Sequence, residues 1–175
     1  MKPPPRSLRS LPPEGSRQPQ GGTDMNPCPP IEACVPHRGS MRLVDRLVAA
    51  DDEHAVVEVD VPLDGLFVRD GAVPAWVGIE YMAQAVSAWA GARALRAGGR
   101  PRIGFLLGTR RYESRVSWFR TGALLRVEAT RELLGDNGLG MFSCRILGDG
   151  EELATANVSV FEPPDAMAYL ETTQQ

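Results

Sequence analysis

Histidine, cysteine and aromatic residues are scarce in this chain of 175 residues, and the first two shortages limit the kinds of site it can form. Its three cysteines, Cys28, Cys34 and Cys144, have no metal-ligand spacing and are not the even set of a disulfide framework. Only two histidines, His37 and His54, are available for acid–base chemistry. We therefore expect no metal site, and a reducing, cytoplasmic location.

The chain also lacks a surplus of positive charge and any long apolar run. Its formal net charge is −3, with 19 Lys and Arg against 22 Asp and Glu, which argues against a general nucleic-acid binder. Charged residues and glycines interrupt every apolar stretch before it reaches the roughly 20 residues that a membrane-spanning helix needs. We therefore expect a soluble protein that binds neither nucleic acid nor a membrane.

Proline and glycine, in contrast, are abundant at the N-terminus. Residues 1–30 combine Pro, Gly, Ser and Arg with almost no large apolar side chains, so they are predicted to form a disordered tail. They lack the apolar core of a secretory signal, and Met25 is an alternative start of the protein. Residues 164–175 are predicted to be a loose C-terminal tail. One folded domain is therefore expected over residues 31–163.

Alternating apolar residues and hairpin signals predict an α+β fold. Residues 41–52 and 54–62 are expected to be strands that precede one long helix. Four more strands are predicted after the helix, at residues 102–116, 123–134, 138–147 and 152–162. Glycine-rich turns at 135–138 and 148–150 join the last three as hairpins, so the sheet is expected to be antiparallel. The predicted architecture is one curved sheet around one buried helix, with these four strands as a meander.

The predicted helix, Val73–Gly98, is apolar on almost every side, which is typical of a buried helix. Pro74 suits its first turn. Its few polar residues, Glu80, Gln84 and Ser87, follow at i, i+4 and i+7 and form one narrow stripe. An ionised carboxylate in such surroundings is costly unless it is paired or protonated, so Glu80 is a candidate functional residue. The alternative is that the stripe is the solvent edge of an amphipathic helix.

Two motifs resemble those of the hotdog-fold β-hydroxyacyl-acyl carrier protein dehydratases. The segment PHRG at 36–39 with MRLVDR at 41–46 resembles the PHR…LVDR segment of the family. The segment PAWVGIEYMAQ at 74–84 resembles the helix that opens with its PG…E-AMAQ signature. The resemblance extends from about Val35 to Phe161, and is closer still to a divergent branch found with polyene and polyketide-type pathways. It implies a hotdog fold, a curved antiparallel sheet wrapped around one long helix.

The resemblance also implies an activity, the dehydration of a 3-hydroxyacyl thioester. The substrate is carried on the phosphopantetheine of acyl carrier protein, and no other cofactor is implied. A base takes the α-proton and an acid protonates the departing hydroxyl, each group contributing roughly 10²–10⁴ in rate. The family uses a histidine in the loop before the helix and a carboxylate on the helix, which meet across a dimer interface. Glu80 matches that carboxylate, and an apolar setting favours the protonated form that an acid requires.

The loop histidine of the family has no counterpart here. Residues 66–74 contain no histidine, and Arg69 and Asp70 stand about where the histidine-bearing turn is expected. His37 lies in the PHR segment, which the family does not use as its base, and His54 is expected to be a surface residue. Three hypotheses follow. The leading one is a subunit of a composite dehydratase, a homodimer or a heterodimer in which a second hotdog protein contributes the histidine.

The second hypothesis is an enzyme that acts alone. It would use Asp70 or His37 as a replacement base, or act as a thioesterase in which Glu80 activates water. The third is a non-catalytic subunit that docks a carrier protein or a partner.

Further residues are candidates for binding. Five arginines stand close together in the sequence, Arg102, Arg110, Arg111, Arg115 and Arg120. They form either a solvated strand face or a basic patch, in which Arg110, Arg111 and Arg115 contact the acidic carrier protein or its phosphopantetheine phosphate.

Aromatic and polar residues around the helix are candidate substrate contacts. Phe67, Trp76 and Trp89 either line an acyl tunnel or belong to the core. His37 and Gln84 are also expected to bind substrate, and Gln84 would hold either the Glu80 carboxylate or the thioester carbonyl.

Overall fold

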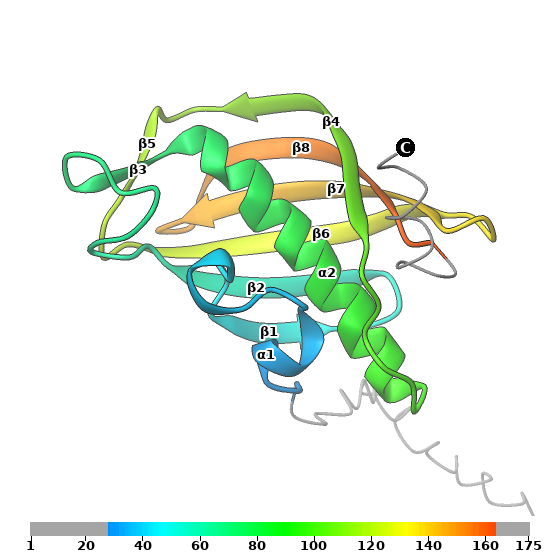
Figure 1. Cartoon of the computed structure of the whole chain (residues 1–175). Helices are drawn as coiled ribbons and strands as arrows, with labels where there is room; N and C mark the ends of the chain where they lie inside the picture. Colours follow the sequence, from blue (N-terminus) through cyan, green and yellow to red (C-terminus); the bar gives the residue numbers. More distant parts are fainter. Residues whose placement is uncertain (1–27, 164–175) are drawn as a thin grey trace, which may run out of the picture.

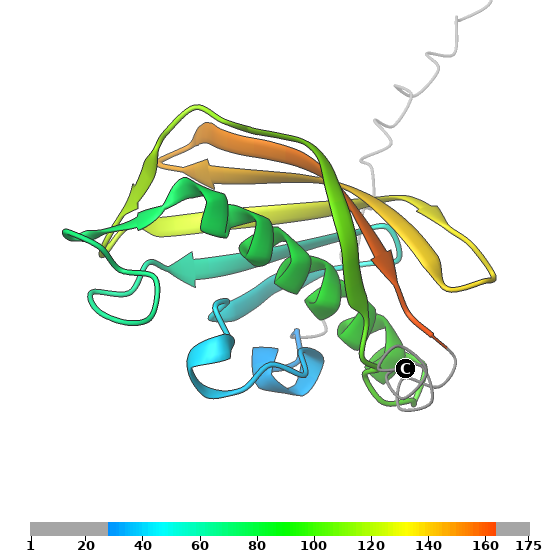
Figure 2. The ribbon, with the colours of Figure 1, turned by 45° about the horizontal axis from the view of Figure 1, so that its top comes forward.

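The computed structural model describes residues 28–163 and shows a curved antiparallel sheet with one long helix across its inner face (Figure 1). The helices in chain order are α1 (Ile31–Cys34), η1 (Gly39–Met41), η2 (Ala75–Val77) and α2 (Gly78–Arg96), of which η1 and η2 are short 3₁₀ helices. The strands are β1 (Arg46–Ala50), β2 (His54–Asp60), β3 (Ala72–Pro74), β4 (Phe105–Ser114), β5 (Trp118–Arg120), β6 (Leu124–Leu134), β7 (Leu139–Gly148) and β8 (Glu151–Phe161). The predicted tails lie outside the described residues, except for residues 28–30. The predicted α+β architecture, a curved sheet around one helix, is confirmed (Figure 2).

Strand order in the main sheet is β1-β2-β6-β7-β8-β4, with antiparallel neighbours throughout. The hairpins β6–β7 and β7–β8 form where their turn residues predicted them. The predicted four-strand meander is wrong for its first strand. This strand, β4, pairs with β8 and not with β6. Both edges of β6 are already occupied, by β2 and β7, so the open edge of β8 is the place left for β4. One edge of β4 therefore stays unpaired among the described residues.

The long helix begins five residues later than its sequence pattern predicts. Ala72–Pro74 form β3, which pairs with β5 in a separate two-stranded sheet, and Ala75–Val77 form a 3₁₀ turn. Pro74 is extended, with ψ 136°, and does not occupy the first turn of α2. Backbone pairing with β5 outweighs the helical pattern here, because Val73 lies opposite Phe119 and the Ala75 N–H donates to the Ser117 carbonyl at 2.9 Å.

The first residue of α2, Gly78, lies against the sheet. A Cβ at this position would lie 2.6 Å from the Tyr112 hydroxyl oxygen and 2.8 Å from Ile146 Cδ1. The Tyr112 hydroxyl in turn donates a hydrogen bond to the Ala75 carbonyl, just before the helix. The absence of a side chain at Gly78 thus sets how closely the start of α2 approaches β4 and β7.

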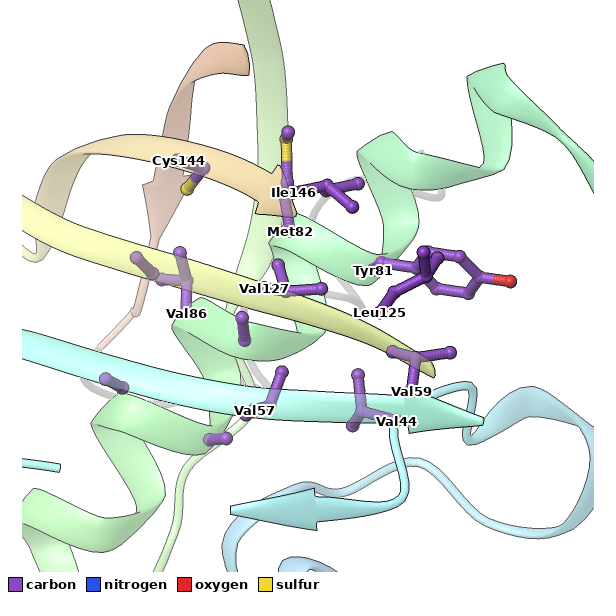
Figure 3. Packing of buried hydrophobic residues seen from close by; sticks show 14 of the residues in the cluster. Val44, Val57, Val59, Tyr81, Met82, Val86, Leu125, Val127, Cys144 and Ile146 are labelled. Atoms are coloured by element: carbon purple, nitrogen blue, oxygen red, sulfur yellow. The ribbon is translucent and has the colours of Figure 1, made fainter. Parts of the chain in front are cut away.

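One apolar core fills the space between α2 and the sheet. Figure 3 shows Tyr81, Met82 and Val86 of α2 facing side chains of β2, β6 and β7, all of them buried. Trp89 stacks edge-on against Phe142, with ring centroids 5.1 Å apart, and is 2% exposed. Trp89 is therefore a core residue and not part of an acyl tunnel. No helix within residues 28–163 is long and apolar enough to cross a membrane.

Candidate active site

Gln84 holds the Glu80 carboxylate in a fixed position. Its side chain is fully buried, and its Nε2 donates to Glu80 Oε1 and to the Met41 carbonyl, each at 2.8 Å. Its Oε1 accepts the Leu43 N–H at 2.8 Å. Because three strong contacts converge on one amide, the carboxylate of α2 is tied to the chain segment that leads into β1. The sequence left open whether Gln84 binds the Glu80 carboxylate or the thioester carbonyl of the substrate. In the structure it binds the carboxylate.

Glu80 lies in the first turn of α2, where the helix dipole stabilises a negative charge. Its side chain is 38% exposed, so the prediction of a carboxylate enclosed by apolar residues is wrong for the single chain. The reason is that Glu80 lines a cavity between α2, the start of β4 and the end of β8, which leaves part of its side chain open. Oε1 is occupied by Gln84, which leaves Oε2 open to a ligand.

The structure brings His37 to Glu80. His37 Nε2 lies 3.8 Å from Glu80 Oε1, although the two residues belong to segments far apart in the sequence. The loop that carries His37 follows α1, which packs directly on α2. A Cβ at Gly91 would lie 1.9 Å from the Cys34 carbonyl oxygen, so only glycine permits this approach. Sequence reasoning gave His37 a minor place, because no local pattern links it to the helix.

A cavity of about 250 Å³ contains both side chains. Its helical wall is formed by small or apolar residues and by Ser87, the third member of the polar stripe. The opposite wall is formed by the start of β4 and the end of β8. The lining residues besides His37 and Glu80 are Ala83, Val86, Ser87, Ala90, Arg102, Gly104, Phe105, Leu106, Val160, Phe161 and Glu162. Acid–base groups at one place in a mainly apolar hollow suit proton transfer on an acyl chain.

The other candidate residues lie elsewhere. Asp70 lines a separate, wider hollow with Trp118, so it is not a neighbour of Glu80 in this arrangement. His54 begins β2, is half-buried and lines a third hollow. Phe67 and Trp76 meet edge to face, with ring centroids 5.8 Å apart, and neither lines the cavity of Glu80. Trp76 is 60% exposed.

The five arginines do not form one patch. Arg102 lines the Glu80 cavity and pairs with Glu162 at 3.7 Å, whereas Arg111 and Arg120 line two different hollows. Arg115 pairs with Glu152 at 3.1 Å. Within residues 28–163, neither Arg110 nor Arg111 has an acidic partner, so these two remain available to an external anion.

Burial makes the thiols poor nucleophiles. It raises the pKa of Cys34 to about 11 and that of Cys144 to about 12, so both stay protonated at neutral pH. In the part of the chain that the structure describes, no group of three His, Cys, Asp or Glu side chains is placed to hold a metal ion. The charged or titratable side chains that line this cavity are Glu80, His37, Arg102 and Glu162, and the last two pair with each other at 3.7 Å.

Comparisons with known proteins show the family of the chain. The model of the ApeP-like family, described as ApeP dehydratase, matches residues 29–171. A chain of the dehydratase heterocomplex ApeI:P from Xenorhabdus doucetiae is 28% identical, with a TM-score of 0.76, over 83% of this chain and 98% of that one. No curated protein sequence matches the chain.

More distant structures share the fold alone. Cj0977, a sigma28-regulated virulence protein from Campylobacter jejuni, is 11% identical with a TM-score of 0.56, over 77% of this chain and 89% of that one. The PaaI protein of the E. coli phenylacetic acid degradation operon is 12% identical with a TM-score of 0.53, over 68% and 78%. The predicted hotdog fold is confirmed by these matches.

Proposed function

Because the chain belongs to the ApeP-like dehydratase family, we propose that it supplies Glu80 as the acid of a composite dehydratase. Its substrate is a 3-hydroxyacyl thioester carried on the phosphopantetheine of acyl carrier protein, in a polyene or fatty-acid-like pathway. The observation that carries the proposal is the carboxylate of Glu80, oriented by Gln84 and open to a cavity.

The reaction removes a proton from Cα, which the histidine of the second hotdog protein would accept, and hydroxide from Cβ. Hydroxide is a poor leaving group, so an acid must protonate it as the C–O bond breaks. Gln84 occupies Oε1 of Glu80, which leaves Oε2 to hold the proton and deliver it. The leaving hydroxyl departs as water, and the carboxylate that remains is stabilised by Gln84 and by the N-terminus of α2.

A second hotdog protein is the proposed partner, as ApeI:P is a heterocomplex. The unpaired edge of β4 supports this, because Leu106 and Leu107 are 42% and 53% exposed on it. A long open edge with apolar side chains is a template for pairing with another chain. Since Leu106 also lines the Glu80 cavity, a partner docked there would enclose the site.

Other contacts belong to the same proposal. Arg110 and Arg111, which have no acidic partner among the described residues, would attract the acidic carrier protein or its phosphate. Arg115, already paired with Glu152, would contribute less. Phe67, which is half-buried, and Trp76, which is exposed, would contact the acyl arm once a partner is docked.

The test is the conversion of a 3-hydroxyacyl carrier protein, followed by mass spectrometry of the loss of water. The purified chain is assayed alone and with a second hotdog protein that carries the loop histidine. We expect activity in the mixture, and Glu80→Gln should lower it by at least about 100-fold. Glu53→Gln, an exposed carboxylate outside the cavity, is the matched control. Full dehydration by the Glu80→Gln complex, or release of a free thiol without dehydration, would overturn the proposal.

A further inference from the structure

We infer that the acyl chain of the substrate lies along α2 from Glu80 to Ala90, and that Ser87 and Ala90 limit the chain length that this subunit accepts. The inference rests on the proposed function, which places the hydroxyl on Cβ beside Glu80. The cavity that contains Glu80 continues past Ala83 and Val86 to Ser87 and Ala90. It therefore extends well beyond the reacting carbons and suits an elongated ligand.

The helical wall of this cavity is built mainly from small side chains. Ala83, Ser87 and Ala90 follow at i, i+4 and i+7, so they lie on one face of α2. All three are half-buried and line the cavity. A larger side chain at any of them would occupy part of the space that is now open. These positions therefore control how far a ligand extends along the helix.

The opposite wall shows which end of the cavity is distal to Glu80. β4 returns along α2, and its start lies beside the C-terminal half of the helix (Figure 1, Figure 2). Leu106, near this start, pairs with Val160 of β8. Arg102 and Glu162 lie beyond that pair, further from Glu80, and form an ion pair at 3.7 Å. The cavity thus has the carboxylate at one end and an ion pair at the other.

The acyl chain suits this cavity better than the phosphopantetheine arm does. Between the two ends, Ser87 is the one polar side chain among the described residues that line the cavity. The arm carries amides, whose burial without hydrogen-bond partners costs free energy, whereas a hydrocarbon chain gains from burial. The thioester and the arm then lie on the other side of Glu80, where Phe67 and Trp76 precede the helix.

The length of the helical wall sets an expected chain length. Glu80 and Ala90 are ten residues apart on α2, which corresponds to about 15 Å along the helix axis. An extended chain advances about 1.2 Å per bond, so roughly 12 carbons beyond Cβ fit between these residues. A longer chain meets Arg102 and Glu162, and hydrocarbon placed against charged groups gains little. Affinity should therefore rise with chain length and level off at about 15 carbons in total.

The test measures binding of 3-hydroxyacyl pantetheines of 4 to 18 carbons to the complex with the second hotdog protein, made with Glu80→Gln to prevent turnover. Adding Ala90→Leu should weaken binding of the longest chains by about 10-fold or more and that of the shortest by less than about twofold. The limit should fall by roughly four carbons, the length of one helical turn. Ser87→Leu, one turn nearer to Glu80, should lower it further. Ala97→Leu, an exposed position outside the cavity, is the control.

The ratio of long-chain to short-chain affinity decides the test, because it does not depend on the folded fraction of a variant. An equal loss at every chain length with Ala90→Leu would place the pantetheine arm in this cavity and overturn the inference. So would unchanged binding at every length, or a shorter limit with Ala90→Leu than with Ser87→Leu. The dehydration assay of the Glu80→Gln complex decides the proposed function separately, since the binding series needs no turnover.

Discussion

The Gln84 amide joins the Glu80 carboxylate, one turn earlier on the same helix, to the backbone of Met41 in a distant segment of the chain. One buried side chain thus has two roles. It completes the hydrogen bonding of the segment that precedes β1, and it aims the carboxylate into the cavity. A change at Gln84 should therefore affect both stability and catalysis.

Gln84→Leu removes the amide and keeps a similar side-chain volume. The Leu43 N–H and the Met41 carbonyl lose their partner in a buried place, at a cost of about 1–3 kcal/mol for each unsatisfied group. We expect the free energy of unfolding, measured in urea, to fall by about 2–4 kcal/mol, and dehydration by the complex to fall about 10- to 100-fold. Ser87→Ala, on the same stripe, should change stability by less than about 0.5 kcal/mol. Equal stability of the two variants would contradict this account.

Gly78→Ala tests the close approach of α2 to the sheet. Alanine would raise helix propensity, yet its Cβ would meet the Tyr112 hydroxyl at 2.6 Å and Ile146 at 2.8 Å. We expect a net destabilisation of about 1–3 kcal/mol, measured by chemical unfolding. Gly108→Ala in β4, where the added Cβ has open space, is the control.

A double-mutant cycle of Gly78→Ala and Tyr112→Phe tests whether the Tyr112 hydroxyl causes this destabilisation. Tyr112→Phe removes the hydroxyl that the new Cβ would meet, so Gly78→Ala should cost less in that background. Strict additivity of the two changes would show that the Tyr112 contact does not limit the helix start.

Leu107→Lys places a charge on the open edge of β4. Leu107 is 53% exposed, so the chain should keep its stability while its binding to the hotdog partner weakens. We expect the Kd, measured by sedimentation, to rise at least about 30-fold, as for a central interface residue. Leu63→Lys is a matched change, since Leu63 is 78% exposed and lies outside the main sheet. A weaker complex with Leu63→Lys and not with Leu107→Lys would place the interface elsewhere.

The buried thiols predict a loss of stability in alkaline solution. In the folded chain burial raises the pKa of Cys34 from 9.0 to about 11 and that of Cys144 from 9.0 to about 12. Above about pH 9 the unfolded chain releases these protons and the folded chain keeps them. The contribution is therefore fully present below pH 9 and is lost as the pH rises towards 11 and 12.

Unfolding by urea between pH 7 and pH 11 is the measurement. The free energy of unfolding should decline above about pH 9, and the double variant Cys34→Ala, Cys144→Ala should decline less steeply, whatever its stability at pH 7. The same slope in both proteins would mean that other groups cause the decline.

Local patterns in the sequence predicted those parts of the molecule that depend on neighbouring residues. The hairpins β6–β7 and β7–β8 follow from their glycine-rich turns, and most of α2 follows from its apolar run. The prediction failed where contacts between distant segments decide. Pro74 is extended because β5 pairs with β3, and β4 lies at the sheet edge because β6 has no free side.

The candidate site divides in the same way. The spacing of Glu80 and Gln84 by four residues on a helix makes them neighbours on any α-helix, so the sequence by itself determined this pair. The proximity of His37 to Glu80 came only from the tertiary structure. It depends on α1 packing against Gly91 and on the backbone held by Gln84, and no periodicity encodes such contacts between segments far apart in the chain.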